Sequence, residues 1–261
     1  MQRAGGTKHS FKKDLPMLTS VRSLLAATVL AGSAFAAAPA FAQDGDITIS
    51  GNAAIVSEYR FRGVDLSGGD IAIQGGIDVS HSSGFYVGTW GSSLDEDTVG
   101  YGHTELDLYA GWTGEVAEGV TADVGILSYM YPNAGPGDFD YIELYGSVGF
   151  TFGPGETTLG VAYAPKQDSL GGYDNLYLYA DMGVGIPDTP VTISGHVGYT
   201  DGTFLTYTND GDAFDWSIGA DYAITPNLSI GVAYTGAQGD IVAPNYNFVD
   251  DAFVGTLSVS F

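Results

Sequence analysis

The stretch ITISGNAAIV, residues 47–56, shows the pattern that repeats along most of this chain. Ile47, Ile49 and Ile55 share one parity, and small polar residues such as Ser50 occupy alternate positions. Successive side chains of an extended strand point to opposite faces, so an alternation with a period of two predicts a strand with one apolar face.

The same alternation recurs throughout the chain and predicts an all-β protein of roughly twelve strands. Regular segments lie at 71–79, 106–112, 142–152, 176–186, 191–199, 214–224, 228–234 and 253–261, and less regular ones near 84–92, 120–131 and 156–164. The opposite faces carry Thr, Ser, Gly, Asn, Gln, Tyr and a few acids, with almost no Lys. Small uncharged polar residues suit a wet lumen better than the solvent face of a soluble sandwich, which remains the alternative.

The connections between these segments alternate in length. Short links fall at 81–84, 113–119, 153–155, 187–190 and 225–227, and long ones at 63–70, 93–102, 132–140, 165–174, 201–213 and 236–250. Short turns at one rim and long loops at the other are typical of bacterial outer-membrane barrels, with the short turns periplasmic. Both ends of the strand-forming region then lie at the short-turn rim, which requires an even number of strands. We therefore predict a transmembrane antiparallel up-and-down β-barrel of about 12 strands.

Tyrosines near the predicted strand ends are expected to sit at the membrane interface, with the ring in lipid and the hydroxyl among the headgroups. They are Tyr129, Tyr131, Tyr141, Tyr145, Tyr163, Tyr199, Tyr222 and Tyr234.

The N-terminal region resembles an export signal. An apolar run from Leu24 to Ala38 is followed by Ala40-Phe41-Ala42, a small-x-small pattern that signal peptidase cuts. We expect residues 1–42 to be a signal peptide cleaved near Ala42. A membrane anchor is the alternative, but the run is shorter than the ~20 apolar residues that span a bilayer.

Two starts of translation remain open. Residues 1–16 are polar and basic, so they form either an extended n-region or a stretch preceding a true start at Met17. In both cases residues 43–261 are expected to form a single barrel domain.

Removal of the leader leaves a very acidic chain. The leader holds five of the 8 Lys and Arg residues and one of the 31 Asp and Glu residues, so three basic and 30 acidic residues remain, with a net charge of −27. This charge excludes nucleic acid as a partner, because its phosphates would be repelled. The absence of Cys argues against a small disulfide-stapled secreted module.

The chain ends on FVGTLSVSF, with an aromatic residue at the last position. Phe253, Leu257, Val259 and Phe261 share one face, an arrangement similar to the C-terminal signal that outer-membrane barrels present to their insertion machinery. Expected partners are therefore this machinery, outer-membrane lipid and small hydrophilic solutes or cations.

Four motifs in combination carry a family resemblance over about residues 47–261. They are Tyr59-x-Phe61-Arg62-Gly63, Phe85-Tyr86 with Trp90, Glu105-x-Asp107, and Tyr131-Pro132 followed by Tyr141-x-Glu143-x-Tyr145. With them the chain resembles the TorF family of porins. The resemblance implies an outer-membrane barrel, named a porin by inference, without an assigned substrate.

Two of the three remaining basic residues, Arg60 and Arg62, lie two positions apart at the end of the predicted first strand. If the isoleucines of residues 47–56 face lipid, then Glu58, Arg60 and Arg62 share the luminal face. An arginine facing lipid near the midplane would cost about 2–4 kcal/mol, which also favours the inward placement.

The same parity places polar and acidic residues on the luminal face of other strands. They are Gln74, Asp78, Glu105, Asp107, Glu143, Asp181, Asp215 and Asp221. Arginines opposite carboxylates would create a transverse field, as in porin constrictions. Alternatively, the pairs simply neutralise luminal carboxylates and tie the wall together. We take Glu58, Arg60, Arg62, Glu105, Asp107 and Glu143 as candidate pore-lining residues.

The expected function is a passive channel in the bacterial outer membrane for small hydrophilic solutes. The acidic residues of the long loops predict a negatively charged channel entrance and a preference for cations. The alternative is a non-conducting structural or surface-interaction barrel. Its acidic loops, which include residues 95–97 and 210–212, would then contact partners or divalent cations.

An outer-membrane hydrolase is a third reading, based on Ser194 and His196, which lie two positions apart on one strand face. Their parity points to the lumen, away from a lipid substrate. We therefore expect neither an enzyme nor a cofactor. We also expect no metal site, since the histidines show no metal-ligand spacing.

Overall fold

The computed structural model describes residues 45–202, 205–239 and 246–261. The predicted signal peptide, residues 1–42, lies outside the described residues. Within the described ranges, no helix has the length and apolar character needed to span a bilayer.

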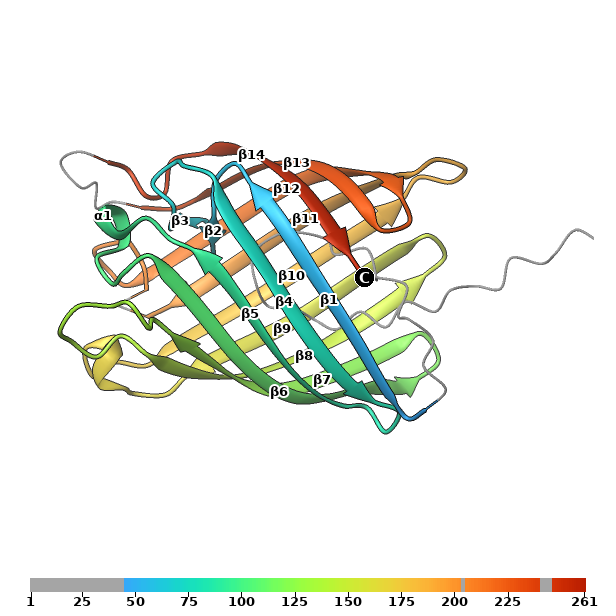
Figure 1. The fold of residues 1–261 in the computed structure, drawn as a ribbon, viewed down its shortest axis with the longest axis horizontal. Helices are drawn as coiled ribbons and strands as arrows, with labels where there is room; N and C mark the ends of the chain where they lie inside the picture. The colour runs from blue at the N-terminus through green and yellow to red at the C-terminus, as the bar shows by residue number, and fades with distance from the viewer. Residues whose placement is uncertain (1–44, 203–204, 240–245) are drawn as a thin grey trace, which may run out of the picture.

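Twelve antiparallel strands close into one barrel (Figure 1). Each strand pairs with its neighbour in the chain, and β1 closes the ring by pairing with both β4 and β14, with Ile55 opposite Leu257 at the seam. The wall consists of β1 (Ile47–Val56), β4 (Ala72–His81), β5 (Phe85–Ser93), β6 (Thr104–Ala117), β7 (Val120–Met130), β8 (Tyr141–Phe152), β9 (Gly155–Ala164), β10 (Asn175–Gly185), β11 (Val191–Asp201), β12 (Asp212–Thr225), β13 (Leu228–Ala237) and β14 (Ala252–Ser260). The predicted fold class and strand number are confirmed.

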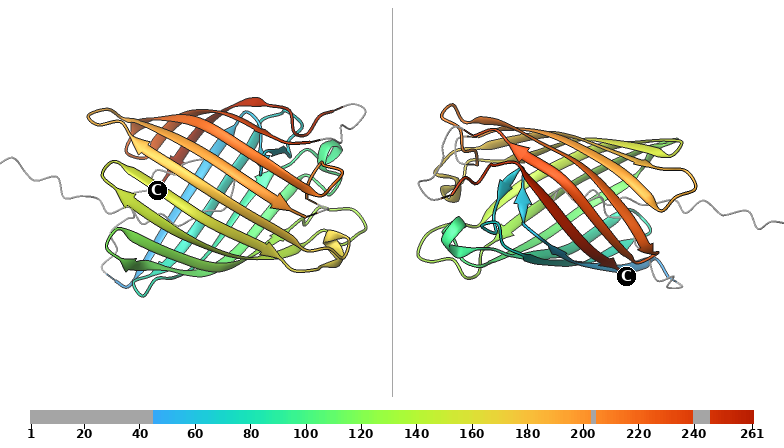
Figure 2. Two further views of the ribbon diagram at one scale, coloured as in Figure 1. Left: turned by 180° about the vertical axis from the view of Figure 1, so that it is seen from behind. Right: turned by 90° about the horizontal axis from the view of Figure 1, so that it is seen from above.

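The two rims of the barrel differ, as the connection lengths predicted. Short turns join the strands at one rim, and at the other lie the longer connections, including the helix α1 (Glu96–Val99) and the 3-10 helix η1 (Asp168–Leu170) (Figure 2). The start of β1 and the end of β14 both lie at the short-turn rim, because an even number of strands returns the chain to its starting side.

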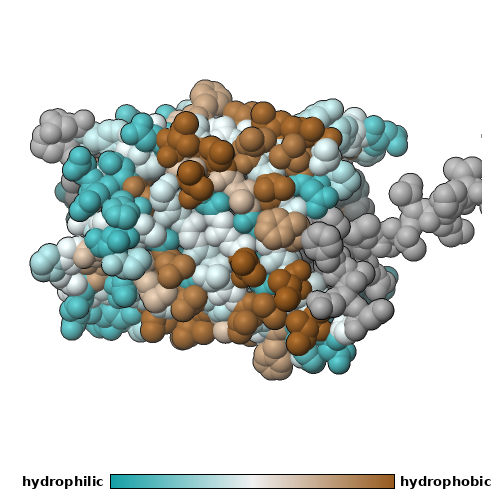
Figure 3. All heavy atoms as spheres, in the orientation of Figure 1, coloured by the Kyte–Doolittle hydropathy of each residue, from teal (hydrophilic) through white to brown (hydrophobic). Residues whose placement is uncertain are grey.

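Many large apolar side chains are exposed on the outside of the wall, and they form brown patches on the face drawn in Figure 3. Along β4, Ile73 is 66% exposed, whereas its neighbours Ala72 and Gln74 are 0% and 9% exposed. Alternation along each strand thus points apolar side chains outward and buries the side chains between them. A soluble protein has the reverse arrangement, with its apolar side chains buried. This outer surface is suited to lipid.

The interfacial placement predicted for several tyrosines is wrong. Tyr129 and Tyr141 are buried inside the barrel with their rings stacked at a centroid distance of 4.3 Å. The hydroxyl of Tyr145 lies 2.5 Å from that of Tyr86, also inside, and Tyr131 packs against the interior aromatic cluster. Tyr163 and Tyr222 do lie on the outer face. Position near a strand end predicts depth in the membrane, but parity determines which face a ring occupies.

Inward-facing tyrosines lie across glycines of the adjacent strand. A Cβ atom added at Gly125 would collide with the ring of Tyr145, and one at Gly160 with the ring of Tyr179. These glycines therefore let large rings lie flat along the inner wall, so that the lumen keeps space that a projecting ring would fill.

Candidate functional site

The chain leaves the barrel wall directly after β1 and turns into the lumen. It forms a small two-stranded sheet from β2 (Arg60–Phe61) and β3 (Val64–Asp65), in which Arg60 pairs with Asp65 and Phe61 with Val64. We call residues 59–67 the inner hairpin. Its position departs from the sequence prediction, in which Glu58, Arg60 and Arg62 continued the first strand: β1 ends at Val56.

A two-residue turn shapes the tip of the inner hairpin. Arg62 and Gly63 both have positive φ angles, 49° and 77°, as a type I′ turn requires. A side chain at Gly63 would also collide with Ala237 and lie 2.9 Å from the Cβ of Asp215. The tip therefore approaches the wall of β12 and β13 so closely that glycine is needed there for both conformation and space.

Aromatic side chains pack the inner hairpin against β5 and β7, on the other side of the wall from β12 and β13. The ring of Tyr59 lies 5.7 Å from that of Trp90, and the ring of Phe61 lies 5.7 Å from that of Tyr129. Trp90 and Tyr129 are themselves 4% and 0% exposed. The hairpin thus forms an apolar core inside the barrel, near its long-loop rim.

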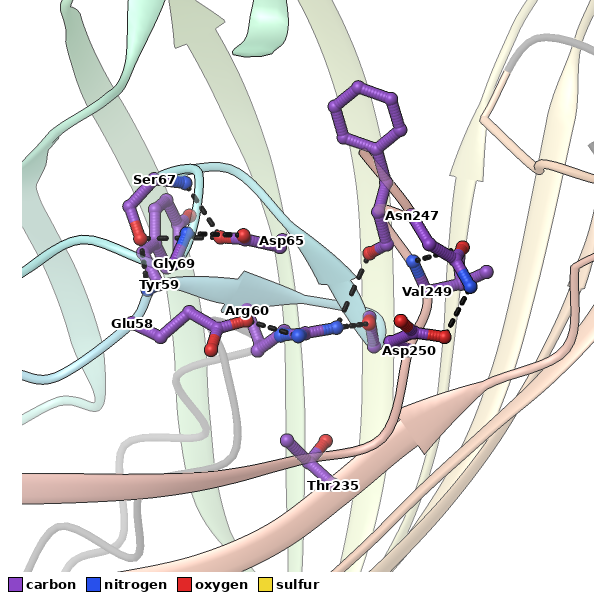
Figure 4. Close-up of polar contacts among 12 residues, drawn as sticks. Glu58, Tyr59, Arg60, Asp65, Ser67, Gly69, Thr235, Asn247, Val249 and Asp250 are labelled. Atoms are coloured by element: carbon purple, nitrogen blue, oxygen red, sulfur yellow. Dashed lines mark hydrogen bonds and ion pairs between the residues drawn. The ribbon is translucent and has the colours of Figure 1, made fainter. Parts of the chain in front are cut away.

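Asp65 and Arg60 connect the inner hairpin to its surroundings (Figure 4). The carboxylate of Asp65 accepts hydrogen bonds from the amides of Ser67 (2.8 Å) and Gly69 (2.7 Å) and from the hydroxyl of Tyr246. Arg60 forms an ion pair with Glu58 and donates to the carbonyls of Gly63 (3.0 Å) and Phe248 (3.3 Å). These contacts join the hairpin to the segment that precedes β14.

Glu58 occupies a partly buried position between β1 and β2. Burial raises its pKa above the ordinary value for a glutamate, and the charge of Arg60 opposes this shift. Desolvation therefore disfavours the charged form of Glu58, and the ion pair with Arg60 favours it.

Arg62 spans the lumen to Glu143 on β8. Its Nη2 atom donates to both carboxylate oxygens, at 3.0 Å to Oε1 and 2.8 Å to Oε2, and Tyr129 donates to the same carboxylate at 3.0 Å. The Arg62 guanidinium lies 4.2 Å from the ring centroid of Tyr177 and 4.7 Å from that of Phe61. This buried pair fixes the tip of the inner hairpin between two sides of the wall.

Glu105 and Asp107 lie on β6 behind the inner hairpin, and both are almost fully buried. Tyr59 donates to Glu105 Oε1 at 3.2 Å, whereas neither oxygen of Asp107 has a hydrogen-bond partner within the described part of the chain. The structure thus brings Arg62 together with Glu143 and leaves the other two carboxyls outside that ion pair.

A second cluster of charged residues lies across β10, β11 and β12. The Nδ1 atom of His196 is 2.6 Å from Asp181 Oδ1, and its Nε2 atom is 2.9 Å from Asp215 Oδ1. The hydroxyl of Tyr177 is 2.9 Å from His196 Nε2 and donates to Asp215 Oδ1 at 3.2 Å. Parity predicts Asp181 and Asp215 in the lumen, but the spacing along β11 suggested Ser194, and not these carboxylates, as the partner of His196.

Strand pairing is the signal that reveals this cluster. Asp181 on β10 lies directly opposite His196 on β11. Asp215 on β12 lies opposite Gly198, two residues beyond His196 on β11. Both ring nitrogens of His196 face carboxylates rather than Ser194, so this geometry does not supply the base that a serine hydrolase needs.

A cavity of about 110 Å³ lies between the inner hairpin and the strands β10 to β14. Its lining includes Arg60, Arg62, Tyr177, His196, Asp215 and Thr235. The arginines of the inner hairpin and the cluster around His196 therefore face the same cavity inside the barrel.

Metal coordination finds no support in residues 45–202, 205–239 and 246–261, where no three His, Asp or Glu side chains are arranged to hold an ion. Asp95, in the acidic loop considered for divalent binding, instead accepts a hydrogen bond from the hydroxyl of Thr98.

Comparison with solved structures finds other β-barrels. The chain is similar to the NanC porin, with a TM-score of 0.57 and 12% identity over 82% of this chain and 98% of that one. It is also similar to the KdgM porin in complex with disordered oligogalacturonate, with a TM-score of 0.51 and 9% identity over 82% and 97% of the two chains. At these identities the likeness concerns the fold alone.

Comparison with curated proteins finds no match. The resemblance to the TorF family stays a prediction, since the family model that matches has another description: it covers residues 40–261 and represents bacterial proteins of unknown function. With more than half of its length matched, this chain belongs to the Gcw_chp family.

Proposed function

We propose that the chain is a passive outer-membrane channel for small hydrophilic solutes. The observation that carries this proposal is the closed wall, which is apolar on its outer surface and encloses charged side chains around a cavity. A barrel with this distribution satisfies its backbone hydrogen bonds inside lipid and leaves a polar path through its centre.

The balance of charges supports a preference for cations. In the lumen, Arg60 is paired with Glu58 and Arg62 with Glu143, so each arginine is already neutralised by a carboxylate. Parity along β4 and β12 places Asp78 and Asp221 in the lumen, where they add negative charge, as does the acidic mature sequence. A negatively charged lumen concentrates cations and repels anions.

The inner hairpin is the proposed constriction. Glu58, Arg60 and Arg62 would line it on the side of the cavity. The other candidates, Glu105, Asp107 and Glu143, are buried between the hairpin and the wall and would hold the hairpin in place. In contrast to a constriction formed by the wall alone, a folded-in segment narrows one side of the lumen and leaves space near β10 to β14.

Delivery to the outer membrane would take the route predicted from the sequence. A signal peptide in residues 1–42 would be removed near Ala42, and residues 43–261 would then fold into the barrel. Phe253 and Leu257 lie exposed on the outer face of β14, where the insertion machinery would contact them together with Val259 and Phe261.

A non-conducting barrel is the second candidate, and the inner hairpin is the observation that favours it. Its aromatic packing fills the lumen beside β5 and β7, so a conducting path depends on the remaining cavity. Such a barrel would act through its outer loops and would carry no current.

Planar-bilayer recording of the refolded protein across a KCl gradient tests the proposal. We expect cation-selective conductance that becomes larger and more cation-selective in the Arg60→Ala, Arg62→Ala double variant. Lys166→Ala is the matched control, since it removes positive charge from an outer loop and not from the inner hairpin. Absence of conductance in all three proteins would reject the channel in favour of the non-conducting barrel.

A further inference from the structure

His196 has an unusual set of partners. Each of its two ring nitrogens lies within hydrogen-bond distance of a different carboxylate, Asp181 on β10 and Asp215 on β12. An ionised carboxylate only accepts hydrogen bonds, and a neutral imidazole has one N–H group. Two simultaneous hydrogen bonds to ionised carboxylates therefore require the imidazolium form, in which both nitrogens carry protons. The Tyr177 hydroxyl also lies 2.9 Å from Nε2, but it donates its proton to Asp215 Oδ1 and leaves the Nε2 contact to the carboxylate.

Other charged and titratable groups face this site from the elements packed around it. Tyr177 and Tyr179 on β10 stack near the imidazole, with ring centroids at 6.4 and 6.3 Å. From the inner hairpin, Arg62 lies over Tyr177 but is bonded to Glu143, and across the cavity Arg60 is paired with Glu58. Among the described residues that line this cavity, His196 is thus the cation that Asp181 and Asp215 share.

We propose that His196 sets the ion selectivity of the channel through its own protonation. This inference rests on the proposed function. As imidazolium, His196 offsets one of the two negative charges that Asp181 and Asp215 place beside the open part of the lumen. When it releases its proton, two carboxylates face the cavity with one acceptor nitrogen between them, and the lumen attracts cations more strongly.

The direction of the effect follows from these charges. Raising the pH through the titration of His196 adds one negative charge to the cavity wall, so the cation-to-anion permeability ratio rises. A unit charge about 4 Å from the path in a water-filled lumen raises the local cation concentration roughly fivefold and lowers the local anion concentration by about the same factor. Lowering the pH through the same range reverses the change.

Reversal potentials in a KCl gradient, recorded between about pH 6 and pH 10, provide the test. This range lies above the ordinary titration of solvent-exposed carboxylates. For the wild type we expect the permeability ratio to rise with pH. His196→Gln should have the high ratio throughout, because an amide carries no charge, and His196→Lys should restore the low ratio over most of the range.

Control variants separate His196 from the other histidines. His103→Gln, at the long-loop rim, should behave like the wild type, because its ring contacts Thr104 rather than a carboxylate of the lumen. Asp181→Asn should lower the ratio at high pH, since it removes one of the charges that deprotonation exposes.

Direct observation of the protonation state keeps the inference separate from the proposed function. Nitrogen chemical shifts of the His196 ring in lipid nanodiscs, assigned with His196→Gln, should show an imidazolium at neutral pH. A neutral ring at pH 7, or a wild-type reversal potential that does not respond to pH, would overturn the inference and leave the channel intact. Absence of conductance at every pH would overturn the proposed function itself.

Discussion

Arg62 Nη2 lies 2.8 Å from Glu143 Oε2, and this ion pair joins the tip of the inner hairpin to β8 on the barrel wall. Both side chains are almost fully buried, at 5% and 1% exposure. Removing one member of such a pair leaves an uncompensated charge in a desolvated site, which costs far more than losing a surface salt bridge.

Loss of this ion pair should therefore destabilise the barrel and release the inner hairpin. We expect Arg62→Ala to lower the free energy of unfolding by about 3–5 kcal/mol. Urea unfolding in lipid vesicles measures this quantity, and Lys166→Ala, at an exposed loop position, should change it little. An Arg62→Ala, Glu143→Gln double variant should lose less than the two single variants combined; additive losses would show that the pair is not coupled.

The turn at Gly63 should be as sensitive as the ion pair. An alanine there meets both the strained φ of 77° and the side chains of Ala237 and Asp215, so the hairpin tip must withdraw from β12 and β13. We expect Gly63→Ala to raise single-channel conductance. Gly153→Ala is the matched control, because that turn glycine also has positive φ, 58°, but has open space around its Cβ position. Equal conductance in both variants would contradict the role of the tip contact.

Flat packing of luminal tyrosines on glycines should contribute to stability. Gly160→Ala forces the ring of Tyr179 away from β9, and such overpacking typically costs about 1–3 kcal/mol. Gly185→Ala, whose nearest atom would be the Pro154 carbonyl at 3.9 Å, should cost less than Gly160→Ala in the same unfolding measurement. If the two variants are equally stable, the tyrosine does not depend on the glycine beneath it.

The C-terminal aromatic residue should matter for assembly rather than conduction. Phe261 pairs through its backbone with Gly51 at 2.8 and 2.9 Å and leaves its side chain exposed at the outer face. Phe261→Ser should reduce the amount of folded barrel recovered from outer membranes, while channels that do form conduct normally. Phe152→Ser, another exposed aromatic near the short-turn rim, serves as control. Equal recovery of both variants would argue against a terminal signal.

Alternation along each strand was sufficient to predict the barrel, because lipid and lumen impose opposite requirements on adjacent residues. Ile47, Ile49 and Ile55 lie on the outer face as expected. The inner hairpin could not be predicted in the same way. Continuing the parity of β1 through Arg60 and Arg62 assumed a straight strand, whereas the chain turns inward after Val56.

Contacts between side chains of neighbouring strands were also beyond the sequence pattern. The same parity that placed Glu143 in the lumen also placed Tyr141 and Tyr145 there, yet their nearness to a strand end suggested the lipid interface. His196 was recognised as luminal, but its two carboxylate partners depend on the registers of β11 with β10 and β12. Parity fixes the face of a residue, and register fixes its neighbours.

Substituted-cysteine accessibility tests most directly whether solutes pass through this lumen. The chain contains no cysteine, so single thiols can be introduced without background. Ser217 lines the cavity, whereas the adjacent Ile218 is 62% exposed on the outer face. A charged thiol reagent should reduce the current through Ser217→Cys and leave that through Ile218→Cys unchanged. Absence of current in both variants, or a current that the reagent does not affect in Ser217→Cys, would contradict the channel.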